Sequence, residues 1–168
     1  MKIRLERFSY RFAEQVLNSK LFLKNEIENI LLNPLINVAE LSRPEFNKVL
    51  DKLFCEKEWN SQPGVFEEKN EPAAKLDFFK ERIGVEVQFG HSSFIGIDLL
   101  KFQVSSYSNL DTIDVGIYIV TTRNFQKKMQ KEYSQNWDGS LNFEKVVKYL
   151  PHFKSAIQVP IYVIGIDL

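Results

Sequence analysis

The sequence predicts an α/β fold in which a mixed central β-sheet is flanked by helices. The first third of the chain has the apolar spacing of helices, whereas later stretches are apolar, β-branched and typical of strands. A helical pattern separates the first strand-like stretches from the next, as a crossover helix would. Because the 168 residues contain no repeat or Gly/Ser-rich linker, we expect one domain over residues 1–168, with a helical part at about 1–58 and a core at about 74–168.

Two helices are predicted in the N-terminal part. Residues 21–33 have a helical apolar stripe that ends before Pro34. A capping box at Ser42 and Glu45 starts the second helix, with Ser42 as the N-cap. Residues 45–59 then present one apolar face, which we expect to be buried. That face consists of Phe46, Val49, Leu50, Leu53 and Phe54.

A hairpin is predicted next along the chain. Residues 60–72 (NSQPGVFEEKNEP) have the composition of a loop, and after them the pattern becomes strand-like. Residues 74–79 and 82–89 are expected to form two short strands joined around Lys80–Arg82.

Four further elements complete the sheet and its covering. Residues 92–108 and 141–150 have helical spacing, and Pro151 ends the second of these helices. Residues 113–122 (IDVGIYIVTT) and 159–166 (VPIYVIGI) are nearly continuous apolar runs, as expected for strands covered on both faces. The stripe of the first helix consists of Phe94, Ile97, Leu100 and Val104.

The composition is that of an ordinary globular protein. Hydrophobic residues make up 44% and charged residues 26%, and the net charge is zero. A single cysteine, Cys55, argues against a disulfide framework or a cysteine zinc site, and we expect it to be a small buried hydrophobe in the second helix. No apolar run is long enough to span a membrane and the start does not resemble a secretory signal, so we expect a cytoplasmic protein without membrane partners. Zero net charge still permits an anionic partner at a locally basic cleft.

Two carboxylates stand among the apolar residues of the predicted hairpin. Glu86 and Gln88 are two residues apart in a strand and therefore share a face. If a two-residue turn at Glu81–Arg82 joins the strands, Asp77 lies opposite Glu86 and all three polar side chains converge. The dipeptide Glu-Arg is unusual for such a turn, and a slip of one residue would remove the direct opposition. Lys75 would share the face of Asp77 and either pair with Glu86 or contact a substrate strand.

Paired carboxylates of this kind favour a hard divalent cation. Mg²⁺ takes oxygen ligands, usually one or two carboxylates together with water, backbone carbonyls and substrate phosphate. Such an ion suits phosphodiester hydrolysis, because it polarises the phosphoryl oxygen and lowers the pKa of bound water. The alternative is that Asp77 and Glu86 are ordinary surface residues on the open face of a hairpin, since the spacing alone is short enough to recur by chance.

The surroundings of the pair make the pattern more specific. The run D-x8-E-V-Q, on Asp77 and residues 86–88, resembles the PD-(D/E)xK nuclease signature in the variant that has glutamine in place of lysine. With the following helix and the apolar strand that ends in threonine, it resembles type II restriction endonucleases of the BglII/BamHI-like group. Residues 1–32 resemble the N-terminal helical region of that group, and residues 159–168 resemble its last core strand.

The resemblance implies a restriction-endonuclease-like core and a homodimer that cuts double-stranded DNA at a short palindrome, with Mg²⁺ as cofactor, Mn²⁺ as an expected substitute and no organic cofactor. It implies that Asp77 is a metal ligand, that the Val87 carbonyl completes the metal shell and that Glu86 binds the ion or orients the attacking water. Gln88 stands where most relatives have lysine, and an amide can position water but cannot act as a general base. Palindromes with a GATC core occur in the group.

Two other functions remain open at this point. One is a catalytically silent DNA-binding relative, and the other is a repair or defence nuclease of the same fold without a fixed site. Relatives in the group continue beyond the last core strand, so a chain that stops at Leu168 is expected to have a reduced recognition apparatus. The dimer interface is expected in the N-terminal helices or in the helix at 93–107.

Several polar residues are candidates for DNA contact. His91, Ser92 and Ser93 follow the predicted catalytic strand and open a helix, although helix capping by Ser92 or Ser93 explains part of this pattern. Thr122 and Arg123 end the central strand, where Arg123 could read guanine or bind phosphate, or could be a surface arginine.

A polar segment follows that strand. Lys127, Lys128 and Lys131 form a small basic cluster that could bind phosphate or simply be solvated. Residues 124–139 are long, polar and rich in Asn and Gln, and are therefore expected to be a recognition loop.

Overall fold

The central feature of the computed structural model is a mixed six-stranded sheet. The structure describes residues 2–65, 75–107 and 111–168. The strand order is β1-β6-β5-β4-β3-β2. The strands are β1 Arg4–Tyr10, β2 Asn60–Ser61, β3 Phe78–Lys80, β4 Ile83–Val87, β5 Val115–Thr121 and β6 Ile161–Asp167.

The three central strands of the sheet run parallel to one another. β4 pairs with β5 and β5 with β6 in parallel, whereas β3 joins β4 and β1 joins β6 in antiparallel pairs. Parallel neighbours need a crossover, and helices lie between each pair of them in the sequence. The carboxyl ends of β4, β5 and β6 therefore meet at one edge of the sheet.

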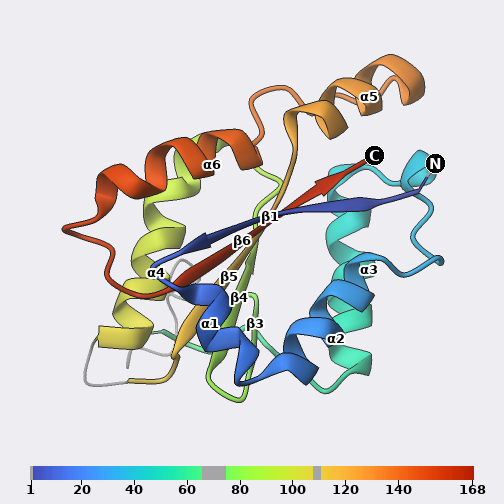
Figure 1. The fold of residues 1–168 in the computed structure, drawn as a ribbon. Helices are drawn as coiled ribbons and strands as arrows, with labels where there is room; N and C mark the ends of the chain where they lie inside the picture. Colours follow the sequence, from blue (N-terminus) through green and yellow to red (C-terminus); the bar gives the residue numbers. More distant parts are fainter. Residues whose placement is uncertain (1, 66–74, 108–110) are drawn as a thin grey trace.

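Helices cover both faces of this sheet, so the chain forms three layers. Figure 1 shows α1, α2 and α3 on one side of the strands and α4 and α6 on the other, with α5 beyond the end of the sheet. The helices are α1 Ala13–Asn18, α2 Leu21–Leu31, α3 Arg43–Glu56, α4 Ile95–Tyr107, α5 Arg123–Tyr133 and α6 Phe143–Tyr149, with 3-10 turns η1 Val38–Glu40, η3 Ser92–Phe94 and η4 Leu150–Phe153.

Each face of the sheet has its own hydrophobic core. Every residue of β5 is buried, and its side chains alternate between the two cores. Ile117 and Ile119 join the core under α1, α2 and α3, whereas Tyr118 and Val120 join the core under α4 and α6. This double covering confirms the expectation for the continuous apolar runs.

The N-terminal helical pattern is confirmed from residue 21 onward. α2 spans Leu21–Leu31 and buries its predicted stripe. The capping box of α3 is present, with the Ser42 N–H donating to the Glu45 carboxylate at 2.9 Å. Of the apolar face predicted for α3, all members are buried except Val49, which is partly buried.

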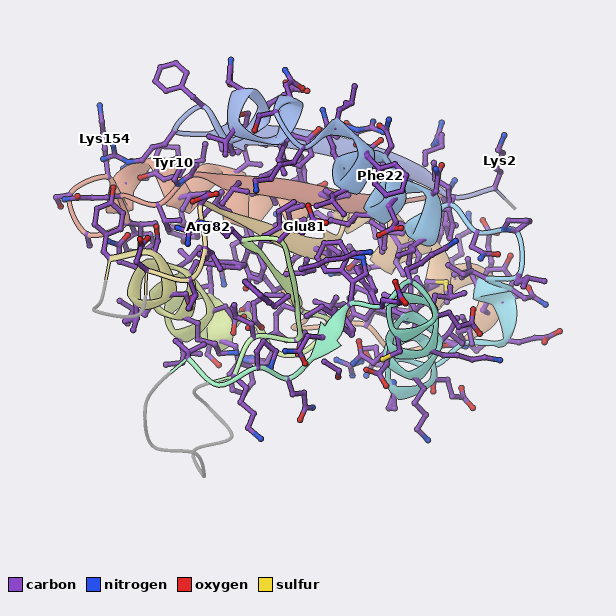
Figure 2. The ribbon with its side chains drawn as sticks, turned by 90° about the horizontal axis from the view of Figure 1, so that it is seen from below. Lys2, Tyr10, Phe22, Glu81, Arg82 and Lys154 are labelled. Atoms are coloured by element: carbon purple, nitrogen blue, oxygen red, sulfur yellow. The ribbon has the colours of Figure 1, made fainter. Side chains whose placement is uncertain are left out.

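The prediction that the chain begins within a helical region is wrong for its first residues. Residues 4–10 form β1, which pairs with β6 along its whole length. Figure 2 shows Lys2 at one end of the molecule and Tyr10 near the opposite end, as this extended pairing requires. Charged residues interrupt the alternation of apolar and polar residues in this segment, so its sequence does not indicate a strand. It forms one because the edge of β6 offers unpaired backbone groups with which it can pair.

Three local expectations also need correction. Residues 123–133 form helix α5, so a recognition loop over 124–139 is wrong for most of that segment. His91, not Ser92 or Ser93, caps the turn that leads into α4, by accepting from the Ser93 N–H. Cys55 is exposed on α3.

Two further expectations depend partly on where the described residues end. The predicted loop at 60–72 begins with the two-residue strand β2, and its part from residue 66 lies outside the described residues. Among the helices that the structure describes, none has the length and apolar character to cross a membrane.

Candidate active site

The predicted hairpin has the predicted turn. Lys80 pairs with Ile83, and Glu81 and Arg82 form the two-residue connection. Both have positive φ, 45° and 66°, as the hairpin turn that matches strand twist requires. The Arg82 side chain is held by Asp114 at 2.8 Å, a contact made possible only by the fold. Tertiary contacts thus support a turn whose own residue types are unfavourable.

The opposition of Asp77 and Glu86 differs from the expectation. The regular ladder ends at Phe78 and Val85, and the Asp77 N–H donates to the Val85 carbonyl at 3.1 Å. Two residues of one strand therefore face one residue of the other, as in a β-bulge. The Asp77 carboxylate instead accepts the Val87 N–H at 2.7 Å. The bulge places Asp77 beside the end of β4 rather than squarely across from Glu86.

Glu86 is a buried carboxylate with a cation beside it. The residue is 2% exposed, and Lys101 Nζ lies 3.0 and 3.1 Å from its two oxygens. Burial raises the pKa of Glu86 to about 9, and the charge of Asp77 adds to this effect while Lys101 opposes it. Burial also raises the pKa of Asp77. The expected partner Lys75 does not form this ion pair, which comes from α4 instead.

Asp98 of α4 connects the polar groups of the site. Its Oδ2 accepts from Gln88 Nε2 at 2.8 Å and from the Tyr118 hydroxyl at 2.7 Å, and its Oδ1 lies 3.4 Å from Lys101 Nζ. Gln88 Oε1 in turn accepts the Gly90 N–H at 2.8 Å. Asp98 is 2% exposed, so these partners provide the hydrogen bonds that a buried carboxylate needs.

Two cavities meet at Asp77 and Val87. One, of about 340 Å³, lies toward α4 and is also lined by Glu86, Gln88 and Lys101. The other, of about 360 Å³, lies toward α3 and includes Asn47, Lys48, Asp51 and Gln62 in its lining. Asp77 is therefore reached from both cavities, whereas Glu86 is reached only from the cavity toward α4.

The oxygen atoms at this edge fit a hard divalent cation. The raised pKa values of Asp77 and Glu86 reflect two buried carboxylates with too little positive charge nearby. Since N–H and C=O of one strand residue point to the same side, the Val87 carbonyl is directed to the edge where its N–H meets Asp77. Within the described ranges no group of three or more His, Cys, Asp or Glu side chains is set to hold a metal. Two carboxylates and a carbonyl, completed by water and substrate, remain a normal Mg²⁺ donor set.

The residues predicted from sequence to contact DNA form two groups in the structure. The first group surrounds His91. His91 and Ser93 are exposed, and their side chains lie 2.9 Å apart at the start of η3. Ser92 accepts from Lys145 Nζ at 2.8 Å, which brings another cation to the loop after β4. His91 also forms an isolated antiparallel β-bridge with Ser140. The loop after β4 therefore lies beside the connection that follows α5.

The second group lies at the start of α5. Thr122 is buried, and its hydroxyl caps α5 by accepting the Phe125 N–H. The same hydroxyl donates to Asp167 at 2.6 Å, so both of its hydrogen bonds are made within the fold. Arg123 and Lys127 are exposed. Lys128 is half-buried and its Nζ donates to the Leu168 carbonyl at 2.8 Å.

Three residues of the site were missed from sequence, namely Asp98, Lys101 and Tyr118. One signal could have found the first two. Asp98 and Lys101 are a charged pair three residues apart in an otherwise uncharged helix that follows the carboxylate strand. Tyr118 lies in a continuous apolar run, and nothing in that run distinguishes its hydroxyl from a core aromatic ring.

Comparison with known proteins agrees with this geometry. A family model described as restriction endonuclease BglII/BglIII matches residues 5–166. A crystal structure of restriction endonuclease BglII complexed with a DNA 16-mer matches with TM-score 0.73 and 20% identity, over 100% of this chain and 77% of that one. The crystal structure of free BglII matches with TM-score 0.62 and 21% identity, over 98% and 79% of the two chains. No curated protein matches significantly. The expected restriction-endonuclease-like fold is therefore confirmed.

Proposed function

The chain belongs to the BglII/BglIII restriction endonuclease family, and we propose that it hydrolyses double-stranded DNA at a short palindrome with Mg²⁺ as cofactor. The observation that carries the proposal is the convergence of Asp77 and Glu86 on one cavity at the carboxyl end of β4. Family membership makes the chain a type II site-specific deoxyribonuclease; the ion and the site that it cuts are our proposals.

Asp77, Glu86 and the Val87 carbonyl would hold the divalent ion. When bound, Mg²⁺ polarises the phosphoryl oxygen and lowers the pKa of its water, and Mn²⁺ is expected to do the same. Glu86 would orient the attacking water, which adds to phosphorus as a P–O bond of the backbone breaks. Gln88 is anchored by Asp98 and Gly90, so its amide is held in a fixed orientation at the same cavity. Its remaining N–H is suited to positioning water and not to accepting a proton.

The partner is double-stranded DNA, as the BglII structure with a DNA 16-mer supports for that relative. We assign backbone contacts to His91, Ser93, Arg123 and Lys127, which are exposed near the edge of the sheet where the carboxylates lie. We leave Thr122 out of this surface because it is buried. Ser92 and Lys128 are weaker candidates, because each already has a partner within the chain. A target with a GATC core is the expectation that the family resemblance supports.

A homodimer is proposed because a symmetric reader suits a symmetric site. α4 is the better candidate for the interface, since three of the four members of its stripe face solvent, namely Phe94 at 50%, Ile97 at 40% and Leu100 at 49%. Val104 is partly buried against the core, and Tyr107, at 60%, extends the exposed face. The exposed residues form one continuous helix face next to the active-site cavity, which Phe94 and Ile97 also line. We place the dimer in the cytoplasm, where cellular DNA is accessible to it.

Digestion of phage DNA tests the function. The wild type is compared with Glu86→Gln, which keeps the shape of the side chain and removes its charge, in Mg²⁺ and in Ca²⁺. Discrete bands that require Mg²⁺ and disappear in the variant support the proposal, and sequencing the ends gives the site. A smear that Glu86→Gln abolishes indicates a nuclease without a fixed site. A folded wild type that binds DNA and never cuts would be a silent relative.

A further inference from the structure

The cavity that receives the substrate is strongly acidic. Asp77, Glu86 and Asp98 all line it, and a DNA backbone brings further negative charge. Among the described residues that line this cavity, Lys101 carries the only positive charge. A phosphodiester cannot approach three carboxylates without compensating cations, so the position of Lys101 matters for the reaction.

Lys101 is held at the cavity by the fold. Its side chain is 11% exposed, and its ammonium bonds to both Glu86 oxygens while lying 3.4 Å from Asp98. Contacts with two carboxylates on different elements, Glu86 on β4 and Asp98 on α4, therefore fix the position of this amino group at the cavity.

The helix that carries Lys101 is fixed by packing and by a buried hydrogen bond. Phe102, the next residue, is fully buried, and its ring lies against the backbone of Gly116 on β5. Asp98, one turn earlier, accepts from the Tyr118 hydroxyl of the same strand. Lys101 is thereby directed at the strand that carries Glu86, from a rigid helix instead of a loop.

We propose that Lys101 is a catalytic residue that contacts the scissile phosphate from helix α4, an inference that rests on the proposed function. The Asp98 contact holds the ammonium at the cavity while its bonds to Glu86 are exchanged for a phosphate oxygen. As water adds to phosphorus and the P–O bond breaks, negative charge grows on the non-bridging oxygens, and an ammonium N–H donor stabilises it. The leaving oxygen keeps the electron pair of the broken bond and takes up a proton from solvent, which receives the proton that the attacking water loses. Lys101 keeps its proton throughout, so the step needs no additional reactant.

The test compares single-turnover cleavage at saturating DNA with DNA affinity in Ca²⁺. Lys101→Met removes the charge and keeps the length of the side chain, and Lys101→Arg keeps the charge. Lys24→Met is a matched control, because the Lys24 side chain on α2 is 12% exposed and is paired with Glu14 of α1 at 2.8 Å. Gln88→Lys combined with Lys101→Met returns an ammonium to the same cavity from the strand.

Lys101→Met should slow cleavage by about 100-fold or more, as loss of one transition-state donor does, with DNA affinity changed by less than about threefold. Lys101→Arg and the double variant should each regain at least about tenfold over Lys101→Met, and Lys24→Met should cleave like the wild type. A purely structural role predicts that the double variant is no better than Lys101→Met and that the melting temperature falls together with the rate; this result overturns the proposal. Cleavage by Lys101→Met at the wild-type rate also overturns it, whereas a wild type that never cleaves refutes the proposed function itself.

Discussion

Lys101 Nζ lies 3.0 Å from Glu86 Oε1, although the two residues belong to a helix and a strand that are separated by a loop. This ion pair joins the element that carries the proposed catalytic carboxylate to the element with the exposed apolar stripe. Changes in α4 can therefore affect both catalysis and assembly, and experiments on this helix need readouts for each.

The α4 interface is tested by placing a charge on its stripe. Leu100→Asp should convert the dimer to a monomer, because a carboxylate at the centre of an apolar interface would be buried without a partner. Sedimentation velocity measures the change. Phe22→Asp is the control, since Phe22 is 74% exposed on α2 (Figure 2) and belongs to the alternative interface. Dissociation by Phe22→Asp with an intact Leu100→Asp dimer would place the contact in the N-terminal helices.

The DNA-contacting role of the α5 start is tested by salt dependence. Arg123→Ala and Lys127→Ala should each weaken DNA binding in Ca²⁺ and reduce the slope of log affinity against log salt by about 1, because each removes one phosphate contact. Lys154→Ala should leave the slope unchanged, since Lys154 is exposed at the end of the molecule away from Lys2 (Figure 2). Equal slopes for all four proteins would exclude these two side chains from the interface.

Asp167 is expected to make stability sensitive to acid. Burial by itself raises the pKa of Asp167, but hydrogen bonds from Thr122 and Asn124 and the charge of Arg4 bring it below its ordinary value of 3.8. A lowered folded pKa stabilises the fold fully above the unfolded value, and this stabilisation is lost as pH falls through the folded value.

The Asp167→Asn variant should therefore lose about 1–3 kcal/mol of unfolding free energy at pH 7, and less below pH of about 4. Urea denaturation at both pH values measures the difference. Asp138→Asn, on an exposed residue, serves as the control and should change little at either pH. A deficit for Asp167→Asn that does not depend on pH would show that charge is not the source of its contribution.

The packing that fixes α4 is tested at Gly116. A Cβ there would lie 2.6 Å from the Phe102 ring, which is fully buried, so the ring or the backbone would have to shift. Gly116→Ala should cost about 1–3 kcal/mol of unfolding free energy. Gly96→Ala, in the exposed first turn of α4 with no neighbour within 4 Å, should be neutral or stabilising by up to about 1 kcal/mol. Thermal denaturation distinguishes the two, and equal melting temperatures would contradict the account of this contact.

The sequence by itself predicted those elements whose patterns lie within a few neighbouring residues. The capping box at Ser42 starts α3, and the apolar runs became the covered strands β5 and β6. The two strand patterns predicted a hairpin, but the pairing of Lys80 with Ile83 depended on assuming a two-residue turn. The carboxylates Asp77 and Glu86 could be identified as a pair because a strand fixes which residues share a face.

Only the tertiary structure decided the remaining features, because they depend on contacts between distant segments. β1 is a strand because the edge of β6 pairs with it. Asp77 is displaced by a bulge that none of the residue types in this segment predicts. The cation beside Glu86 comes from α4 and not from Lys75 on the neighbouring strand. Hydrophobic periodicity gave the helix 92–108 without indicating which face meets the sheet, and the face with Asp98 and Phe102 is the buried one. Burial of charged groups is favourable only when partners from other elements are in place, so the full site emerges from the assembled fold.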